Sequence, residues 1–198
     1  MRSKICAWLL PLLVDFTVVT KSVAGELTKD PASWRPVVYT DLQIGGPANQ
    51  SFLSLWSDAI AKNNRVYLKQ GDRRWTLTNA PAVESHFLVR SDQKTVVLSV
   101  LNSVTGCKIF QSDSATKSSL KHCPMRLAVY DRVKRQNSVS DAGTGCFIEY
   151  GGKVDPSSDP ARNASLAAYD IATKTIRTRV IFADKLAKDC EIRVPISN

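Results

Sequence analysis

The stretch "GCKIFQSDSATKSSLKHC", residues 106–123, holds two cysteines, a histidine and a run of serines and lysines. One interpretation is a metal or nucleophile site built from Cys107, His122 and Cys123, and the other is a loop closed by a disulfide. A zinc site needs reduced thiolates and a fourth ligand, for which only His86 remains as another imidazole. A Cys–His nucleophile needs a free thiol. The choice therefore depends on whether the protein lies in an oxidising compartment.

The N-terminus indicates export. Two positive charges, Arg2 and Lys4, precede the apolar run "ICAWLLPLLV" at residues 5–14, and the small-residue pattern "SVA" follows at residues 22–24. A charged start, a short apolar core and a small-residue exit are typical of a cleaved secretory signal peptide. We therefore expect residues 1–24 to be a signal peptide and the protein to be exported, either to a bacterial periplasm or to the cell exterior. The apolar run is too short to span a bilayer, and no membrane span is predicted.

Without the signal peptide the chain keeps an even number of cysteines, which in an exported protein predicts two disulfides. Four cysteines allow three pairings, but two motifs recur. T-G-C-x-I surrounds the first and third cysteines, and C-x-[Met/Ile]-Arg-[Leu/Val] begins at the second and fourth. This indicates an internal duplication of residues 105–129 and 144–196, with chance similarity of short β segments as the alternative. The duplication predicts the bridges Cys107–Cys123 and Cys146–Cys190, with no metal site.

The charge balance is basic. The chain carries 27 Lys and Arg against 18 Asp and Glu, a formal net charge of +9. Three basic residues and one acidic residue fall within residues 1–24, which leaves 24 against 17, or +7. Such an excess is either a solvated surface or a source of attraction to an acidic protein, an anionic polymer or a membrane surface. Nucleic acid is not an expected partner, because no dense basic–aromatic motif is present.

The length of the mature chain predicts one domain with its own core. Residues 25–48 carry several prolines and are expected to be an extended segment, with an edge strand at residues 36–42. Residues 49–64, "NQSFLSLWSDAIAKNN", have apolar side chains at helical spacing, so one amphipathic helix packed on a sheet is predicted there. The single β-rich domain then covers residues 49–198.

After the helix the apolar period changes to two. Residues 65–78 are predicted to form a hairpin that turns at residues 70–72, and residues 84–101 a second hairpin that turns at residues 91–94. Further strands flank the disulfide stretch, and a closing hairpin turns near residues 172–174. Many short strands with one helix predict a mainly β fold, either an antiparallel sandwich or a barrel-like sheet.

The sequence favours a non-catalytic protein. It contains no glycine-rich phosphate loop, no HExxH and no GxSxG motif, and it predicts no cofactor and no catalytic residue. A carboxylate pair for cleaving envelope polymers remains an alternative, because Asp131, Asp141, Glu149 and Asp155 are close in sequence. Against it, loop aspartates more often cap turns.

These observations favour an exported protein that binds another protein, such as an inhibitor, an immunity factor or an accessory factor of envelope assembly. The alternatives are a secreted effector or assembly subunit with pairing strand edges, and a hydrolase of envelope polymers. The predicted contact surfaces are residues 112–122 and 151–165. The predicted contacts to a partner, which the basic charge suggests is acidic, are Lys117, Lys121, His122, Arg132, Lys134 and Arg135.

Overall fold

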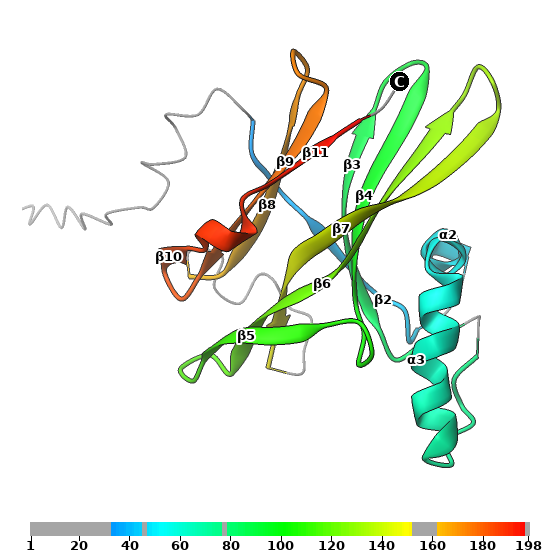
Figure 1. The fold of residues 1–198 in the computed structure, drawn as a ribbon, viewed down its shortest axis with the longest axis vertical. Coiled ribbons are helices and arrows are strands. Elements are labelled where there is room, and N and C mark those ends of the chain that lie inside the picture. The colour runs from blue at the N-terminus through cyan, green and yellow to red at the C-terminus, as the bar shows by residue number, and fades with distance from the viewer. Residues whose placement is uncertain (1–32, 45–46, 77–78, 152–161, 197–198) are drawn as a thin grey trace, which may run out of the picture.

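A computed structural model describes residues 33–44, 47–76, 79–151 and 162–196, so the predicted signal peptide and most of the predicted loop 151–165 lie outside the described residues. Two antiparallel sheets make up most of this part (Figure 1). Sheet I contains β1 (Arg35–Pro36), β8 (Ala164–Asp170), β9 (Thr175–Phe182), β10 (Lys185–Leu186) and β11 (Ile192–Pro195), with the short helix η1 (Lys188–Cys190) before β11. Sheet II contains β2 (Val38–Asp41), β3 (Val83–Arg90), β4 (Lys94–Asn102), β5 (Lys108–Asp113), β6 (Ser118–Asp131) and β7 (Gln136–Tyr150).

The two sheets share one apolar core. Phe87, Leu98 and Met125 of sheet II pack with Ala167 and Ile176 of sheet I. Alternation along each strand places these side chains on the inner faces and leaves polar residues outside. The chain is therefore mainly antiparallel β structure, as predicted.

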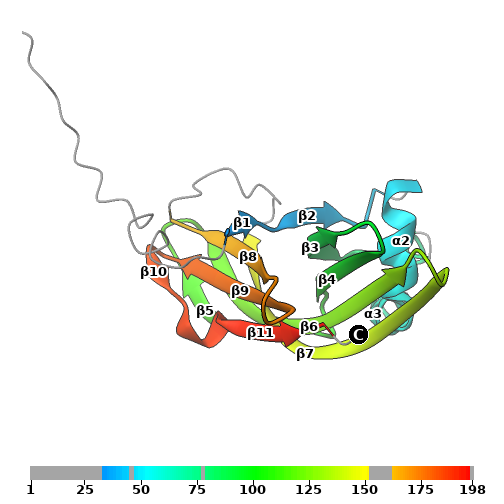
Figure 2. The same cartoon turned by 90° about the horizontal axis from the view of Figure 1, so that it is seen from above.

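The sheets are connected on both sides without closing into a barrel (Figure 2). On one side the chain runs from β1, which pairs with β8, directly into β2, which pairs with β3. On the other side the disulfide Cys146–Cys190 joins β7 to η1. No backbone ladder joins β7 to sheet I among the described strands, so the barrel-like alternative does not hold.

Both predicted disulfide pairings are confirmed. Cys107–Cys123 connects residues 16 apart, and Cys146–Cys190 connects residues 44 apart. The first bridge fastens the start of β5 to β6, which pair as neighbouring strands, whereas the second spans the two sheets. Bonded cysteines do not supply the thiolates that a zinc site or a nucleophile at residues 106–123 would require. Two disulfides are typical of an oxidising, extracytoplasmic compartment.

The prediction of one helix followed by a hairpin at residues 65–78 is wrong. Helix α2 (Pro47–Leu55) is followed by a second helix, α3 (Ser57–Lys69). Between α3 and β3, the strand pairing among the described residues is an isolated bridge between Thr76 and Asn79. Asn63, expected near the helix end, is buried in the middle of α3. The alternating residues 65–68 suggested a strand, but such short runs are ambiguous, and here Tyr67 packs as part of the helix against Trp75.

Both helices lie against the outer face of sheet II (Figure 1). Leu53, Trp56 and Ile60 are buried there with Leu101 of β4, which confirms that the apolar stripe packs on a sheet. None of the helices that the structure describes is long and apolar enough to cross a bilayer.

Candidate functional site

The six predicted partner contacts do not form one patch. Three lie at the β5 end of β6, and three lie in the turn between β6 and β7. A 14-residue strand is about 45 Å long at roughly 3.3 Å per residue. The first group is Lys117, Lys121 and His122, and the second is Arg132, Lys134 and Arg135.

Lys121 is engaged within the chain. Its Nζ lies 2.7 Å from Oε1 of Glu149, which also accepts from Asn102, and Oε2 of Glu149 accepts from the Ser119 hydroxyl. Burial acts to raise the pKa of Glu149, but the hydrogen bonds from Lys121 and Asn102 outweigh it and hold this pKa below its ordinary value. The charge of Lys121 is thus largely neutralised, which argues against Lys121 as a contact to an acidic partner.

Lys121 and Glu149 line a polar cavity of about 600 Å³ together with three tyrosines. Burial raises the pKa of Tyr39 to about 12, and its hydroxyl makes a 2.9 Å hydrogen bond with Ser165. Tyr39 therefore stays neutral at physiological pH. The other two tyrosines are Tyr67 and Tyr150.

The predicted contact loop at residues 112–122 is mostly a regular hairpin. β5 and β6 pair up to Asp113 and Ser118, so only residues 114–117 form the turn. Lys117 is exposed in this turn, in the left-handed backbone region at φ 53°. His122 stacks on Phe110 with ring centroids 4.0 Å apart. Pairing shortens the exposed loop because residues 118–122 belong to a strand and do not extend into solvent.

The hairpin turn is held by Asp113, which is buried. Its Oδ2 accepts from the guanidinium of Arg162 at 2.9 Å and from the hydroxyl of Thr116, and its Oδ1 accepts from the N–H of Ala115. The hydrogen bond from Arg162, followed by that from Thr116, lowers the pKa of Asp113 to about 2. Asp113 therefore joins the hairpin to the start of β8 in the other sheet through Arg162.

This pairing predicts an acid-dependent contribution to stability. The folded state lowers the pKa of Asp113 from 3.8 to about 2. The ionised carboxylate therefore contributes fully to the free energy of unfolding at a pH above its ordinary pKa, and this contribution is lost as the pH falls through about 2. We expect Asp113→Asn to be less stable than wild type by a constant amount above about pH 5, and this difference to shrink between about pH 4 and pH 2. Urea unfolding across this pH range measures it, and a difference independent of pH would contradict the assignment.

The carboxylates proposed for hydrolysis are far apart. Asp131 is the last residue of β6, while Glu149 pairs with Ser119 near the other end of the same strand. Ser119 and Asp131 are twelve residues apart along β6, which corresponds to about 40 Å. The two carboxylates of a glycosidase lie roughly 5–10 Å apart. Asp141 accepts a hydrogen bond from the backbone N–H of Gly143 in a β-bulge, and Asp155 lies outside the described residues. This arrangement offers no support for a hydrolase built on Asp131 and Glu149.

A polar network beneath the helices was not predicted. Glu84 is fully buried; its Oε1 lies 2.7 Å from Nδ1 of His86, and its Oε2 accepts from the Ser99 hydroxyl. The Ser99 oxygen in turn accepts from the indole N–H of Trp56. A buried polar group must be hydrogen-bonded, and here the chain of hydrogen bonds through Ser99 fastens Trp56, between the two helices, to β3 and β4. Its residues come from three distant segments, so no local signal in the sequence marks it.

Beside this network lies a cleft of about 860 Å³ between the helices and the strands β4, β6 and β7. We call it the α2 groove. Phe52 and Leu55 of α2 form one wall, and Val97, Tyr130 and Val139 contribute apolar surface from the strands. Hydroxyl and amide side chains surround these residues; they are Gln50, Ser51, Ser54, Ser57, Thr95, Asn137 and Ser138. An apolar floor with a polar rim is the composition of protein-binding surfaces.

Arg126 closes one part of this groove. Its guanidinium donates two hydrogen bonds to the carboxylate of Asp58, at 2.8 and 2.7 Å, and a third to the carbonyl of Leu55. It also lies 4.5 Å from the ring centroid of Trp56. The hydrogen bonds from Arg126 lower the pKa of Asp58 to about 2. The wall formed by α2 and the start of α3 is therefore held in place by a strand of sheet II.

Comparison of the chain with protein-family models, with curated proteins and with solved structures finds no significant match. A proposal for function therefore rests on the geometry of the described residues.

Proposed function

We propose that the protein is an exported, non-catalytic binding protein that accepts a segment of another protein in the α2 groove. Val139 carries this proposal: it is an aliphatic side chain in the wall of an 860 Å³ groove that Phe52 and Leu55 also line, and it is 53 % exposed. This apolar surface is removed from water only when another molecule fills the groove, and its removal from water favours binding. The two disulfides and the N-terminal sequence support an exported protein, for which an accessory role in envelope assembly or inhibition of an envelope enzyme is suitable.

The geometry also suggests why the site suits recognition. The groove walls belong to paired strands and to a helix that Arg126 and Trp56 hold, so little conformational freedom is lost on binding. The charged side chains that line the groove, Asp58 and Arg126, are already paired with each other. This favours binding by shape and apolar contact over chemistry.

The groove predicts a specific loss of binding. A photo-crosslinking residue at Tyr130 would capture the partner in the source organism, and the purified pair would then be titrated. We expect Val139→Lys to weaken that complex by about 30-fold or more, because a buried contact at the centre of an interface is replaced by a charge. Val104→Lys is the matched control, since Val104 is 62 % exposed and lies at the polar cavity instead. Equal affinities of the two variants would contradict a site in the groove.

A second candidate function is that of an assembly subunit, which pairs with other chains through an open strand edge, and one observation on β7 favours it. Among the described strands β7 pairs only with β6, and residues 136–141 are all exposed, which leaves the other edge of this segment open. Such an edge can add a further strand. The bulge at Ala142 and Gly143, where Gly143 has φ 84°, ends the straight part of the edge. Crosslinks from Tyr130 to a second copy of this chain, with oligomers that grow with concentration, would favour this candidate.

A further inference from the structure

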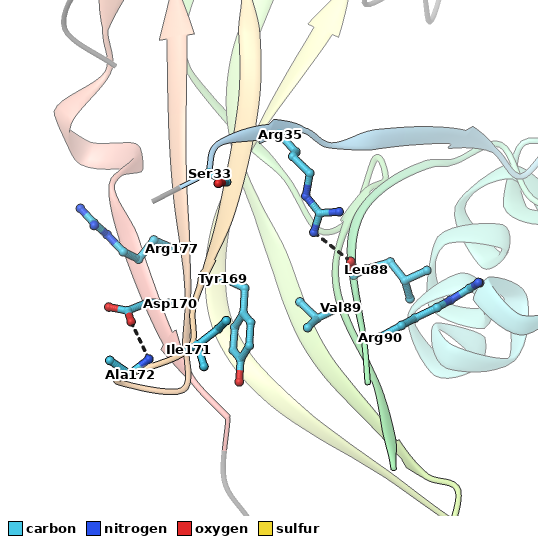
Figure 3. Close-up of a pocket in the computed structure, with 10 residues that line it drawn as sticks. All are labelled: Ser33, Arg35, Leu88, Val89, Arg90, Tyr169, Asp170, Ile171, Ala172 and Arg177. Carbon is cyan, nitrogen blue, oxygen red and sulfur yellow. Dashed lines mark hydrogen bonds between the residues drawn. The ribbon is translucent and has the colours of Figure 1, made fainter. Parts of the chain in front are cut away.

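Three hairpin turns lie at one end of the molecule. Figure 1 shows the turns of β3–β4, β6–β7 and β8–β9 at the same end. The first two are in contact, because the N–H of Arg132 donates to the carbonyl of Gln93 at 2.7 Å. The third lies across a cleft of about 810 Å³ that is bounded by Leu88, Val89 and Arg90 on one side and by Tyr169, Asp170 and Ile171 on the other (Figure 3). We define the tip surface as residues 90–94, 131–135 and 170–174.

Two of these turns have the same construction. In each, an aspartate accepts hydrogen bonds from the backbone of the residues that follow: Asp131 from Val133 and Lys134, and Asp170 from Ala172 and Thr173. In each, a large aliphatic residue lies within the turn, and a basic residue in the left-handed region ends it. These basic residues are Arg135 at φ 54° and Lys174 at φ 50°.

The aliphatic residues of these turns are among the most exposed large apolar side chains of the described residues, and only Ile44, at 79 %, is comparable. Val133 is 74 % exposed and Ile171 is 80 % exposed. The tip surface also carries six basic residues against three acidic ones, a net charge of +3. Two of the three acidic residues are occupied by backbone N–H groups of their own turns. The basic residues are Arg90, Lys94, Arg132, Lys134, Arg135 and Lys174.

We propose that the tip surface docks on an anionic lipid bilayer. Aliphatic side chains on rigid turns with surrounding cations have the chemistry of interfacial insertion, in which apolar groups enter the head-group boundary and Lys and Arg contact lipid phosphates. Figure 3 shows Tyr169 and Val89 on opposite walls of the cleft, which lies between β3 and the β8–β9 hairpin. A protein interface needs a contiguous apolar centre, whereas a fluid bilayer accepts aliphatic residues at separate points. The lipid therefore fits this geometry better.

We assign Arg132, Lys134 and Arg135 to lipid, which goes beyond the proposed function because none of these residues lines the α2 groove. The two surfaces adjoin where Arg132 donates to Thr95 at the groove rim. The full chain with both disulfides formed would be sedimented with vesicles of equal parts phosphatidylglycerol and phosphatidylcholine, and with pure phosphatidylcholine. We expect tighter binding to the anionic vesicles than to the neutral ones, and loss of this difference between about 0.05 M and 0.5 M salt, where screening becomes strong. Removing two cations by Arg132→Gln and Lys134→Gln should weaken binding about 25-fold, at roughly fivefold for each charge.

Matched variants separate the tip surface from other parts of the chain. Val133→Ser with Ile171→Ser should weaken vesicle binding at least about tenfold through lost apolar insertion. Val104→Ser with Ile109→Ser, and Lys185→Gln with Lys188→Gln, alter exposed residues away from the tip surface and should leave binding unchanged. The apolar run at residues 5–14 is present in every variant, so differences between variants report on the tip surface. Amide exchange should slow at residues 131–135 and 170–174 with vesicles, but not at residues 114–117.

Equal binding to both kinds of vesicle, or tip variants that bind as wild type does, would overturn the proposal. If the tip variants instead lost affinity for the protein captured from Tyr130 while their vesicle binding was unchanged, a protein would occupy this surface and the lipid assignment would be wrong. If Val139→Lys bound the captured protein as tightly as wild type, the groove proposal would be wrong, but the vesicle result would be unaffected. The two proposals can therefore fail separately.

Discussion

Replacing Cys146 and Cys190 together by alanine is expected to lower the free energy of unfolding by about 4 kcal/mol, because the bridge closes a loop of about 45 residues in the unfolded chain. Its position in the fold adds to this expectation. Cys146 belongs to β7 and Cys190 to η1, and no ladder joins these two elements among the described strands. Against a typical total stability of about 5–15 kcal/mol, this loss would leave many molecules unfolded in mild denaturant.

The double variant Cys107→Ala and Cys123→Ala is the control for this prediction. It opens a loop of only about 17 residues, for which the same chain-entropy relation gives roughly 3 kcal/mol. It also leaves β5 and β6 paired by their own ladder. Guanidinium unfolding of both double variants measures the two losses. A smaller loss for Cys146 and Cys190 than for Cys107 and Cys123 would show that the sheets do not depend on the bridge between them.

Replacing Trp56 by alanine is expected to cost about 3–5 kcal/mol, the range for removing a large aromatic side chain from a core. Trp56 is 1 % exposed, its indole N–H donates to Ser99 at 3.0 Å, and its ring lies under the guanidinium of Arg126. Its loss therefore removes apolar burial and one buried hydrogen bond at the junction of α2 and α3. We expect the helices to separate from sheet II before the disulfide-linked sheets unfold.

Two further substitutions make this prediction specific. Trp75→Ala removes the same side chain from a partly exposed position and should cost about 1 kcal/mol or less. Trp56→Phe keeps most of the apolar surface but removes the N–H donor, and should cost about 1–3 kcal/mol because Ser99 loses a partner. Thermal unfolding followed by circular dichroism gives each value. Trp56→Ala should also abolish partner binding in the α2 groove, since α2 forms its wall.

Local patterns in the sequence determined much of the strand structure and both disulfides. The predicted turns at residues 91–94 and 172–174 match the hairpins β3–β4 and β8–β9, because period-two alternation and turn residues act over a few neighbouring positions. The repeated motifs around the cysteines identified both pairings. Where a local pattern was ambiguous, prediction was wrong: the short alternation at residues 65–68 continues α3, because packing of the helix overrides so weak a signal.

Only the tertiary structure decided which side chains lie together. The six predicted partner contacts are near one another in sequence, yet β6 separates them into two groups. The nearest members, His122 and Arg132, are about 33 Å apart along the strand, because a strand advances about 3.3 Å per residue. Conversely, Val133 and Ile171 are 38 positions apart and reach the same end of the molecule, because two hairpins in different sheets end there. The α2 groove likewise combines a helix with strands 40 or more residues away. Composition and period act locally, whereas strand length, register and sheet packing determine which distant turns share a surface.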